Sequence, residues 1–396
     1  MGITPWRTLH VEVNEDGTVG GSHQALFDLV CGLDRSLFSP VVLFYQQNRF
    51  VQRFRAAGVE THVFDAQRAR ERNGMSTRGT LTKGVRMISA VLRRFSFIRK
   101  HRIELLHLNN SPFAGTEDWL PAGRMARIPC VAALMGPVGD EGLARRWLAR
   151  RFDCYLPISD LVAESVQRLG VPVARIRRIY LGVDIEGIRG SITRAPDDVR
   201  AELGAPPGSI LVAMVGNVRE WKGQHVVLEA LRGLRPEELQ QLRVVFVGAM
   251  SEGDLPYYAE LQRRIGDWGL SHVARFLGAR TDVPDLLNAA DIALHASIKP
   301  EPFGLVVVEA MAMGTPVIAA NTGGPAEVLT RGSGLTFDPT RPSELTAALR
   351  RLAWDPALRQ QQAARASERV QEFSVAQNVQ ETQSAFLEAL AGRNRP

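Results

Sequence analysis

The sequence is poor in cysteine and contains no long apolar run. It has three cysteines in 396 residues, Cys31, Cys130 and Cys154, at wide spacing. That pattern argues against a disulfide framework or a cysteine metal centre, and it is typical of small buried side chains in a reducing compartment. No stretch approaches the roughly 18 uninterrupted apolar residues of a membrane span. Met1–Val13 lacks a charged region followed by an apolar one, so we expect no export signal and a cytoplasmic protein.

Length and charge limit the possible organisation of the chain. A chain of 396 residues is too long for one ordinary core, so two domains of about 200 residues each are expected. Residues 1–185 carry 26 Lys and Arg against 17 Asp and Glu, and the remainder carries 22 against 25. The basic first half suggests an anionic partner there, although solvated surface is the commoner cause of such an excess.

Short apolar runs alternate with helical patterns along both halves. Thr8–Val13 is the first expected strand, and Ile210–Val215 restarts the alternation after a junction at 186–208 that carries three prolines. This alternation predicts α/β architecture with parallel, helix-covered sheets. We therefore expect a first domain at 1–185 and a second domain at 186–374, followed by a terminal segment at 375–396 that is largely helical.

One stretch, residues 295–329, carries the strongest chemical pattern. Two prolines interrupt it near its start, Leu305–Met313 is rich in helix-forming residues, and Val317–Ala320 fits a short buried strand. Two carboxylates lie eight residues apart, Glu301 in the loop and Glu309 on the expected helix. This stretch is therefore expected to run from a strand end through a loop and a helix to another strand.

The spacing of these carboxylates suits a nucleotide sugar. The first amides of a helix lack intrahelical partners and favour an anion, so a diphosphate could sit near Gly304 and Leu305. Glu309 lies one turn deeper, where it could accept hydrogen bonds from the vicinal hydroxyls of a ribose. Glu301 would face the group at the other end of the diphosphate. On spacing alone the alternative stays open, namely an exposed loop acid and an acid stabilised by the helix dipole.

The same residues resemble the donor-site signature of glycosyltransferase family 4. The resemblance rests on Glu301-Pro-Phe-Gly-Leu-Val-Val-Val-Glu309, the following Ala-Met-Ala-Met-Gly-Thr-Pro-Val-Ile-Ala, and Thr322-Gly-Gly-Pro-Ala-Glu327. It implies the GT-B fold, in which an acceptor-side first domain and a nucleotide-sugar-binding second domain, both Rossmann-like, face a cleft and the last helix, 375–396, crosses back onto the first domain. It also implies retaining transfer of a sugar from a nucleotide diphosphate. It also implies that Glu301 contacts the donor sugar and Glu309 the ribose, with Phe303, Gly304 and Leu305 among the substrate-binding residues.

The family resemblance extends to two further loops. Lys222-Gly223 follows Gly216-Asn217 at a strand-to-helix turn, where a lysine is well placed to meet phosphates. Lys222, one of only four lysines, is thus assigned to the diphosphate, with Asn217 and Arg219 as further donor contacts. A surface lysine is the alternative. In the first domain the resemblance carries over Gly20 and Gly21, which would face the donor across the cleft, and Ser22 is expected to cap the next helix.

The first domain departs from the family at one position. Many members have a histidine at the end of the strand at Val131–Leu134, whereas this chain has Met135. His107 and Asn109, at the end of a neighbouring strand, are the candidates to replace it, although a lone strand-end histidine is more often structural. The sequence offers no evident carboxylate nucleophile there, so the family resemblance implies direct retaining transfer assisted by the leaving phosphate.

The expected enzyme needs no metal and no cofactor beyond its nucleotide-sugar substrate. The sequence offers no Asp-x-Asp-like pair for a divalent cation, and Lys222, Arg219 and helix amides could stabilise the leaving diphosphate instead. The prediction is a cytoplasmic hexosyltransferase acting on a glycan or lipid-linked acceptor in cell-surface polysaccharide or glycolipid synthesis. A nucleotide-sugar epimerase of similar fold and a non-catalytic sugar-binding protein are the alternatives. No pattern indicates nucleic-acid binding.

A basic helix suggests that the first domain docks on the inner face of an anionic membrane. The helical pattern of Leu81–His101 predicts an apolar face (Leu81, Val85, Ile88, Leu92, Phe95) opposite a basic one (Lys83, Arg86, Arg93, Arg94, Lys100). A second basic cluster surrounds Trp147, with Arg145, Arg146, Arg150 and Arg151. Basic residues near an anionic leaflet contribute about 1 kcal/mol each. The alternative is that the apolar face packs on the sheet and the arginines are merely solvated.

Overall fold

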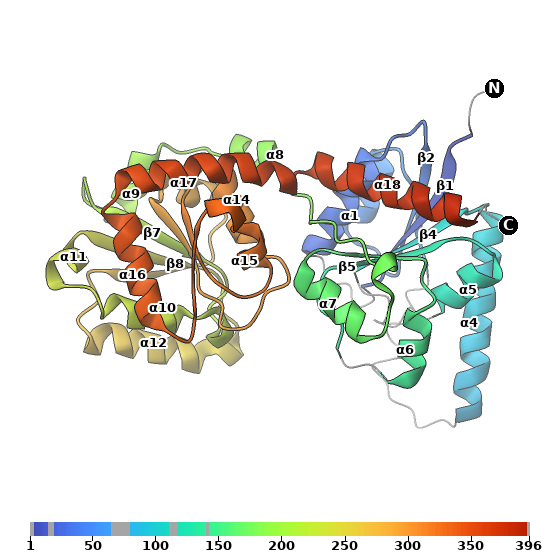
Figure 1. The fold of residues 1–396 in the computed structure, drawn as a ribbon, viewed down its shortest axis with the longest axis horizontal. Helices are drawn as coiled ribbons and strands as arrows, with labels where there is room; N and C mark the ends of the chain where they lie inside the picture. Colours follow the sequence, from blue (N-terminus) through green and yellow to red (C-terminus); the bar gives the residue numbers. More distant parts are fainter. Residues whose placement is uncertain (1–3, 15–19, 65–79, 111–117, 140–141, 394–396) are drawn as a thin grey trace. The chain divides into compact units, whose positions relative to one another are not determined.

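The chain forms two compact units in the computed structural model, which describes residues 4–14, 20–64, 80–110, 118–139 and 142–393 (Figure 1). The first unit comprises 1–182 together with 375–396, and the second comprises 183–374. The division therefore falls three residues before the expected boundary at 185, and the last helix belongs to the first unit. The expected polar loop at 65–79 lies outside the described residues.

The first domain is built on a six-stranded parallel sheet with the order β3-β2-β1-β4-β5-β6. Its strands are β1 (Trp6–Glu12), β2 (Phe38–Phe44), β3 (Glu60–Val63), β4 (Leu105–Asn109), β5 (Cys130–Leu134) and β6 (Cys154–Pro157). Its helices are α1 (Gly21–Gly32), α2 (Arg49–Ala56), α4 (Thr80–Lys100), α5 (Trp119–Met125), α6 (Leu143–Ala149), α7 (Asp160–Arg168) and α18 (Val375–Arg393). The order reverses between β1 and β4, as in a doubly wound sheet.

The second domain repeats this topology, with the strand order β12-β11-β10-β7-β8-β9. Its strands are β7 (Ile210–Val215), β8 (Leu242–Val247), β9 (Ala274–Gly278), β10 (Ile292–His295), β11 (Val317–Ala320) and β12 (Leu335–Phe337). Its helices are α8 (Ile185–Gly190), α9 (Pro196–Glu202), α10 (Gln224–Leu231), α11 (Pro236–Gln240), α12 (Leu255–Asp267), α13 (Val283–Ala289), α14 (Leu305–Ala312), α15 (Gly324–Val328), α16 (Pro342–Ala353) and α17 (Pro356–Arg369). The prediction of two Rossmann-like α/β domains is confirmed.

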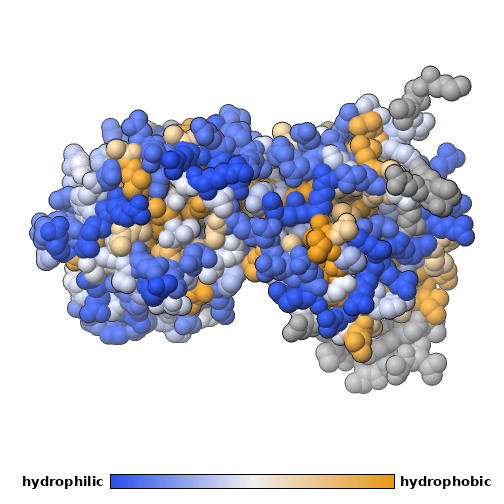
Figure 2. Space-filling model, viewed as in Figure 1, coloured by the Kyte–Doolittle hydropathy of each residue, from blue (hydrophilic) through white to orange (hydrophobic). Residues whose placement is uncertain are grey.

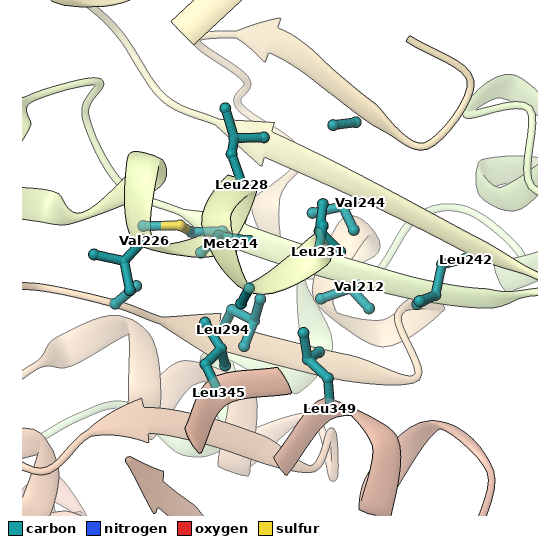
Figure 3. Close-up of a cluster of buried hydrophobic side chains, with 14 of the residues drawn as sticks. Val212, Met214, Val226, Leu228, Leu231, Leu242, Val244, Leu294, Leu345 and Leu349 are labelled. Carbon is teal, nitrogen blue, oxygen red and sulfur yellow. The ribbon is translucent and has the colours of Figure 1, made fainter. Parts of the chain in front are cut away.

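The core of the second domain explains why its strands appear as continuous apolar runs in the sequence. Strands of a parallel sheet are covered by helices on both faces, so both sets of side chains are buried. Val212 and Met214 of β7 face Leu228 of α10 and Leu345 of α16 across one such layer (Figure 3). The opposite faces of β7 and β8 pack against α9 and α13 in a separate cluster.

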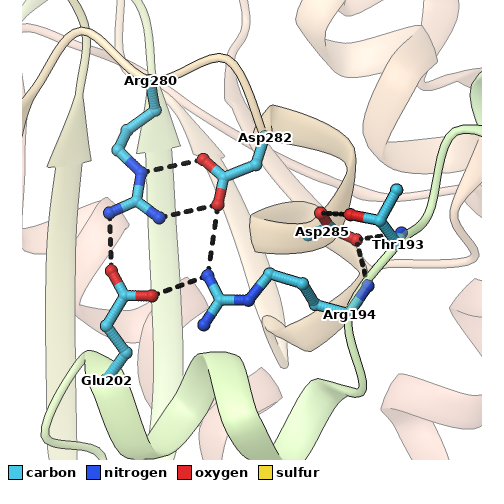
Figure 4. Close-up of polar contacts among 6 residues, drawn as sticks. All are labelled: Thr193, Arg194, Glu202, Arg280, Asp282 and Asp285. Carbon is cyan, nitrogen blue, oxygen red and sulfur yellow. Dashed lines mark hydrogen bonds and ion pairs between the residues drawn. The ribbon is translucent and has the colours of Figure 1, made fainter.

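The prediction of a domain junction at 186–208 was wrong. This segment forms α8 and α9 and is part of the second domain. The carboxylate of Asp285 accepts hydrogen bonds from the amide and hydroxyl of Thr193, at 2.8 and 2.9 Å. Arg280 pairs with Glu202 and Asp282, and Arg194 contacts both of these acids (Figure 4). Val199 of α9 is fully buried. Pro196 thus begins α9, and the charged side chains form ion pairs within the second domain, so this segment is not a linker.

Helix α18 completes the core of the first domain. Phe386 is fully buried, and its ring lies 5.3 Å from that of His107 and 6.2 Å from that of Phe38. The side-chain amide of Asn378 donates to the carbonyl oxygen of Tyr180 at 2.6 Å. The last helix therefore packs on the sheet of the first domain, as the family resemblance implies.

Helix α4 does not present the face that its sequence pattern predicts. Ile88 and Leu92, expected in the core, are 61% and 51% exposed, whereas Arg94, expected on the basic face, is 1% exposed. The guanidinium of Arg94 lies over the rings of Phe64 and Trp119, at 4.3 and 5.3 Å, and pairs with Asp118 at 3.3 Å. Aromatic faces attract a buried guanidinium, which the helical period alone does not reveal. The side chains of Leu81, Lys83, Val85 and Arg86 lie outside the described residues.

The described helices are all too short or too polar to cross a bilayer. Most of the molecular face in Figure 2 is hydrophilic, with separate apolar areas. The apolar side chains that are most exposed on the first domain include Leu143 and Trp147 of α6, at 87% and 57%.

We expect Phe386→Ala to lower the free energy of unfolding of the first domain by about 3–5 kcal/mol, because it removes a fully buried ring and leaves a cavity. Urea unfolding followed by circular dichroism measures the loss. Leu387→Ala, at the adjacent position with 37% exposure, is the matched control and should change stability by less than about 1 kcal/mol. Equal losses in the two variants would contradict the packing of α18 described above.

Candidate functional site

The candidate site of the second domain lies where its strand order reverses. Strands β7 and β10 are neighbours in the sheet, while the connections that follow them lead in opposite directions. In open α/β sheets, ligands bind beyond the carboxyl ends of the strands at such a switch point. Lys222 is in the loop that follows β7, and Glu301 is in the loop that follows β10. The fold therefore brings together two residues that are 79 positions apart.

The carboxylate of Glu301 is the centre of a polar cluster. The ammonium group of Lys222 donates to Oε1 of Glu301 at 2.6 Å, and Nε2 of His295 lies 2.8 Å from the same oxygen. The hydroxyl of Ser297 also donates to Oε1. Across the described residues, no protein group donates to Oε2 of Glu301. One carboxylate oxygen thus orders three side chains, and the second oxygen can accept hydrogen bonds from a ligand.

Glu301 stays ionised at ordinary pH. Burial alone would raise the pKa of this carboxyl, but the hydrogen bond and charge of His295, with the charge of Lys222, lower it to about 2. His295 and Ser297 are almost completely buried, and Nδ1 of His295 has no hydrogen-bond partner within the described part of the chain. This arrangement fits a histidine that donates through Nε2. The sequence interpretation missed both residues, although polar side chains at the end of β10 were a signal of this site.

Two glycines let the loops of the site approach each other closely. Gly223, which follows Lys222, has φ +78°, and a Cβ there would lie 1.9 Å from the carbonyl oxygen of Ala296. Gly323 has φ +66°, and a Cβ there would lie 2.4 Å from the carbonyl oxygen of Glu301. Both positions therefore require glycine on steric and conformational grounds. The amide of Gly324 donates to the same Glu301 carbonyl at 2.9 Å, which fixes the loop that carries the carboxylate.

The amino end of α14 has the properties of an anion site. Gly304 is its N-cap with φ +86°, and no side chain caps the helix. Leu305, the first helical residue, is 38% exposed. Glu309, one turn further, is half-buried, and burial raises the pKa of its carboxyl. Its carboxylate has no hydrogen-bond partner within the described part of the chain, so it is able to accept bonds from a ligand.

Three other residues that are predicted to contact the donor differ in their exposure: Asn217, Arg219 and Phe303. Asn217 is exposed after β7, and its carbonyl oxygen accepts from the side-chain amide of Gln224 at 3.0 Å. Arg219 is 45% exposed and pairs with Asp254 at 3.6 Å. The ring of Phe303 is buried, 5.8 Å from that of Phe373, so this side chain supports the loop from within the core.

A second polar cluster lies at the switch point of the first domain, beyond β1 and β4. The side-chain amide of Asn109 donates to Oε2 of Glu12 at 2.6 Å and to the carbonyl oxygen of Ser22 at 3.2 Å. Gly20 is the N-cap of α1 and Gly21 its first residue. Ser22 therefore lies inside the helix, and the prediction that it caps α1 was wrong. Glu12, an acid at a strand end before a glycine-rich loop, was missed by the sequence interpretation.

His107 has the surroundings of a core residue. It is fully buried, and its Nδ1 lies 3.1 Å from Nδ1 of His10. Burial lowers the pKa of His107 to about 3, so the ring stays neutral. Its Nε2 is buried without a hydrogen-bond partner among the described residues. The structure thus favours the structural interpretation of this strand-end histidine over a catalytic one.

Two known family profiles match this chain, one in each domain. The profile of the family described as Glycosyl transferases group 1 matches residues 196–369, and that of a Glycosyl transferase 4-like domain matches residues 20–182. Together they cover most of both domains. The chain belongs to glycosyltransferase family 4. Its fold is GT-B. The solved structures that it resembles share this fold.

Curated relatives of this family 4 chain are D-inositol 3-phosphate glycosyltransferases. The protein from Corynebacterium kroppenstedtii is 32% identical over 53% of this chain and 47% of its own length. The protein from Saccharomonospora viridis is 29% identical over 76% of this chain and 74% of its own length. The chain thus spans about half the length of several curated relatives that it matches.

Solved structures resemble the family 4 chain over nearly its whole length. Anabaena HepE in complex with UDP-glucose has a TM-score of 0.71 and 25% identity, and the match covers 98% of this chain and 99% of that one. A glycosyltransferase from Rickettsia africae has a TM-score of 0.80 at 16% identity, covering 98% and 99% of the two chains. The second likeness supports the fold alone.

Glu12 predicts a pH dependence of stability. Burial raises the pKa of its carboxyl from 4.5 to about 7, so the folded protein favours the protonated form. The stability contributed by Glu12 is therefore complete below about pH 4.5 and is lost as the pH rises through about 7. We expect Glu12→Gln, which stays neutral, to be more stable than the parent at about pH 8 by at most about 3 kcal/mol, and similar to it at about pH 4.5.

Urea unfolding at a series of pH values tests this expectation. Glu164→Gln, which removes the same charge from the exposed face of α7, is the matched control and should not change the pH profile. A Glu12→Gln profile parallel to that of the parent would show that Glu12 does not titrate in this range.

Proposed function

We propose that this chain is a retaining hexosyltransferase that uses a uridine diphosphate sugar as donor. The observation that carries the proposal is the Lys222–Glu301–His295 cluster beside the uncapped amino end of α14, at the switch point of the second domain. The UDP-glucose complex of a structurally similar protein, Anabaena HepE, supports the choice of donor. A lysine and free helix amides can bind a diphosphate. Free carboxylate oxygens can accept hydrogen bonds from sugar hydroxyls.

The proposed reaction uses the cluster in two ways. Lys222 leaves Oε1 of Glu301 to bind the diphosphate, while Glu301, still held by His295 and Ser297, accepts hydrogen bonds from the donor sugar. The bond between the sugar C1 and the diphosphate oxygen breaks, and the acceptor oxygen bonds to C1 on the same face. The acceptor proton passes to the leaving phosphate oxygen. Lys222 and the α14 amides stabilise the charge on that phosphate without a metal ion.

The acceptor in this proposal is a glycan or a lipid-linked sugar, as in cell-surface polysaccharide or glycolipid synthesis. The names of the curated relatives favour a second candidate, a phosphorylated inositol. An assay of UDP-sugar consumption with each acceptor separates the two, and the anomeric configuration of the product by NMR tests retention. Release of an altered free sugar without acceptor would favour an epimerase, and binding without turnover a sugar-binding protein.

We expect Glu309→Ala to weaken UDP binding and Glu301→Ala mainly to lower turnover. Removing a carboxylate that accepts hydrogen bonds costs roughly 1.5–3 kcal/mol, or about ten- to a hundredfold. Calorimetric titration with UDP measures binding, and steady-state kinetics measures turnover. Excess EDTA in the kinetic assay also tests whether activity needs a metal ion. Glu237→Ala, on the exposed surface of α11, is the matched control. Unchanged binding and turnover in both site variants would overturn the site assignment, and activity that requires magnesium would overturn metal independence.

A further part of the proposal is that the first domain docks on the inner face of an anionic membrane. The exposed surface of α4 carries Met87, Ile88 and Leu92 next to the exposed cations Arg93 and Lys100. Apolar side chains and cations on one helix surface suit the boundary between lipid headgroups and acyl chains. This surface differs from the predicted one, because Arg94 is buried and the apolar residues are exposed.

We expect the protein to sediment with anionic vesicles at low salt and not with zwitterionic vesicles. The double variant Arg93→Glu/Lys100→Glu should lose this binding because it reverses two exposed charges. High salt should weaken binding, since the Debye length falls from about 8 Å to about 3 Å at 1 M. Arg275→Glu, an exposed residue of β9, serves as the control. Equal sedimentation of the double variant and the parent would show that α4 does not contact the membrane.

A further inference from the structure

A third polar cluster lies at the amino end of the first sheet, away from the strand ends that carry Glu12 and Asn109. Glu60 and His62 are two residues apart in β3, so their side chains share one face of the strand. His101 directly follows α4. Nε2 of His62 and Nδ1 of His101 lie 2.8 and 3.0 Å from the same carboxylate oxygen, Oε1 of Glu60. Each of the three side chains offers a ligand atom within 4.8 Å of the others.

Neighbouring side chains hold this cluster in place. The ring of Phe97 stacks on His101 at 4.2 Å and meets His62 edge-on at 5.2 Å. The guanidinium of Arg7 donates to Oε2 of Glu60, and its Nε donates to the carbonyl oxygen of His101 at 2.5 Å. Metal ligands are commonly oriented by such outer partners.

We propose that Glu60, His62 and His101 form a binding site for a divalent transition-metal ion, with Zn²⁺ as the best fit. Zinc takes imidazole nitrogen and carboxylate oxygen at about 2.0–2.2 Å, which places ligand atoms about 3.3 Å apart in a tetrahedral site. The two nitrogen–oxygen separations of 2.8 and 3.0 Å need to grow by only a few tenths of an ångström, and the two ring nitrogens lie within 4.8 Å of each other. The side chains of His62, His101 and Glu60 are 31%, 16% and 38% exposed, which leaves access for a water as fourth ligand.

The three ligand atoms are already hydrogen-bonded to one another. Nε2 of His62 and Nδ1 of His101 both contact Oε1 of Glu60, and a metal ion would take the place of the protons in these contacts. The two ring nitrogens that face Oε1 must be unprotonated to bind metal, and each neutral ring then carries its proton on its other nitrogen. Arg7 offsets the charge of Glu60, so we expect the two imidazoles to dominate the affinity. Imidazole ligands select zinc, cobalt, nickel or copper over magnesium and calcium.

The role of the site follows from its position. β3 is an edge strand of the sheet, and His101 lies just beyond the end of α4. A metal ion bound to both would join a strand that pairs with β2 alone among the described strands to a 21-residue helix. It would therefore stabilise the first domain, and removing it should leave the chemistry of the second domain unchanged.

Titration of the EDTA-treated full-length protein with Zn²⁺, in competition with a chromophoric chelator, tests the proposal. We expect one equivalent to bind, and no competition from Mg²⁺. His62→Asn and His101→Asn should each weaken binding by about a hundredfold or more, since even outer partners of a metal contribute about 10- to 100-fold. His272→Asn, at an exposed histidine of the second domain, is the matched control. Circular dichroism of each variant checks that it is folded.

Melting provides a second measurement that does not depend on activity. Zinc at a hundredfold excess over its Kd should raise the melting temperature of the first domain by about 5–10 °C in the parent and in His272→Asn, but not in the two cluster variants. The visible absorption of bound Co²⁺ should differ from that of aqueous Co²⁺ in the parent and in His272→Asn, but not in the two cluster variants. Absence of zinc binding, or equal binding in parent and cluster variants, would overturn the proposal.

Discussion

The hydrogen bonds that converge on Oε1 of Glu301 are the constraint on which the candidate donor site depends. Lys222 comes from the loop after β7, whereas His295 and Ser297 come from the end of β10. The carboxylate therefore joins the two strands at which the sheet reverses its order. Burial opposes ionisation of Glu301, whereas His295 and Lys222 favour it, so removing either of these two side chains would raise the pKa of the carboxyl. Gly223 and Gly323 allow this convergence by letting backbone approach backbone.

Much of this arrangement could be predicted because it rests on local chemistry. The α/β alternation predicted both sheets, and the spacing of Glu301, Gly304 and Glu309 predicted a loop followed by a helix whose amino end is free. The pairing of Lys222 with Glu301 was not predicted, although both residues were assigned to the donor. Sequence spacing gives the position of each residue along its own element, but the contact between two loops depends on which strands are neighbours in the sheet.

The errors also have physical causes. The helical period of α4 predicted that Arg94 is exposed and Leu92 buried, because it counts charge and apolarity alone. The guanidinium of Arg94 is enclosed by Phe64 and Trp119 and pairs with Asp118. Arg94 is therefore the buried residue and Leu92 the exposed one. His107 fits a catalytic pattern in the sequence, yet α18 covers it from a position 279 residues later. Interactions between distant segments thus account for most of what sequence patterns missed.

The path of the chain makes the second domain an insertion within the first. Residues 183–374 form one unit, and the residues on both sides of them fold together in the other. The ends of the inserted unit adjoin, since the amide of Val183 donates to the carbonyl oxygen of Phe373 at 2.8 Å. A fragment that stops at Gly182 would lack α18 and leave His10 and Phe38 without the ring of Phe386. The second domain is therefore encoded by one continuous segment of the gene, whereas the first domain is encoded by two segments that are separated by it.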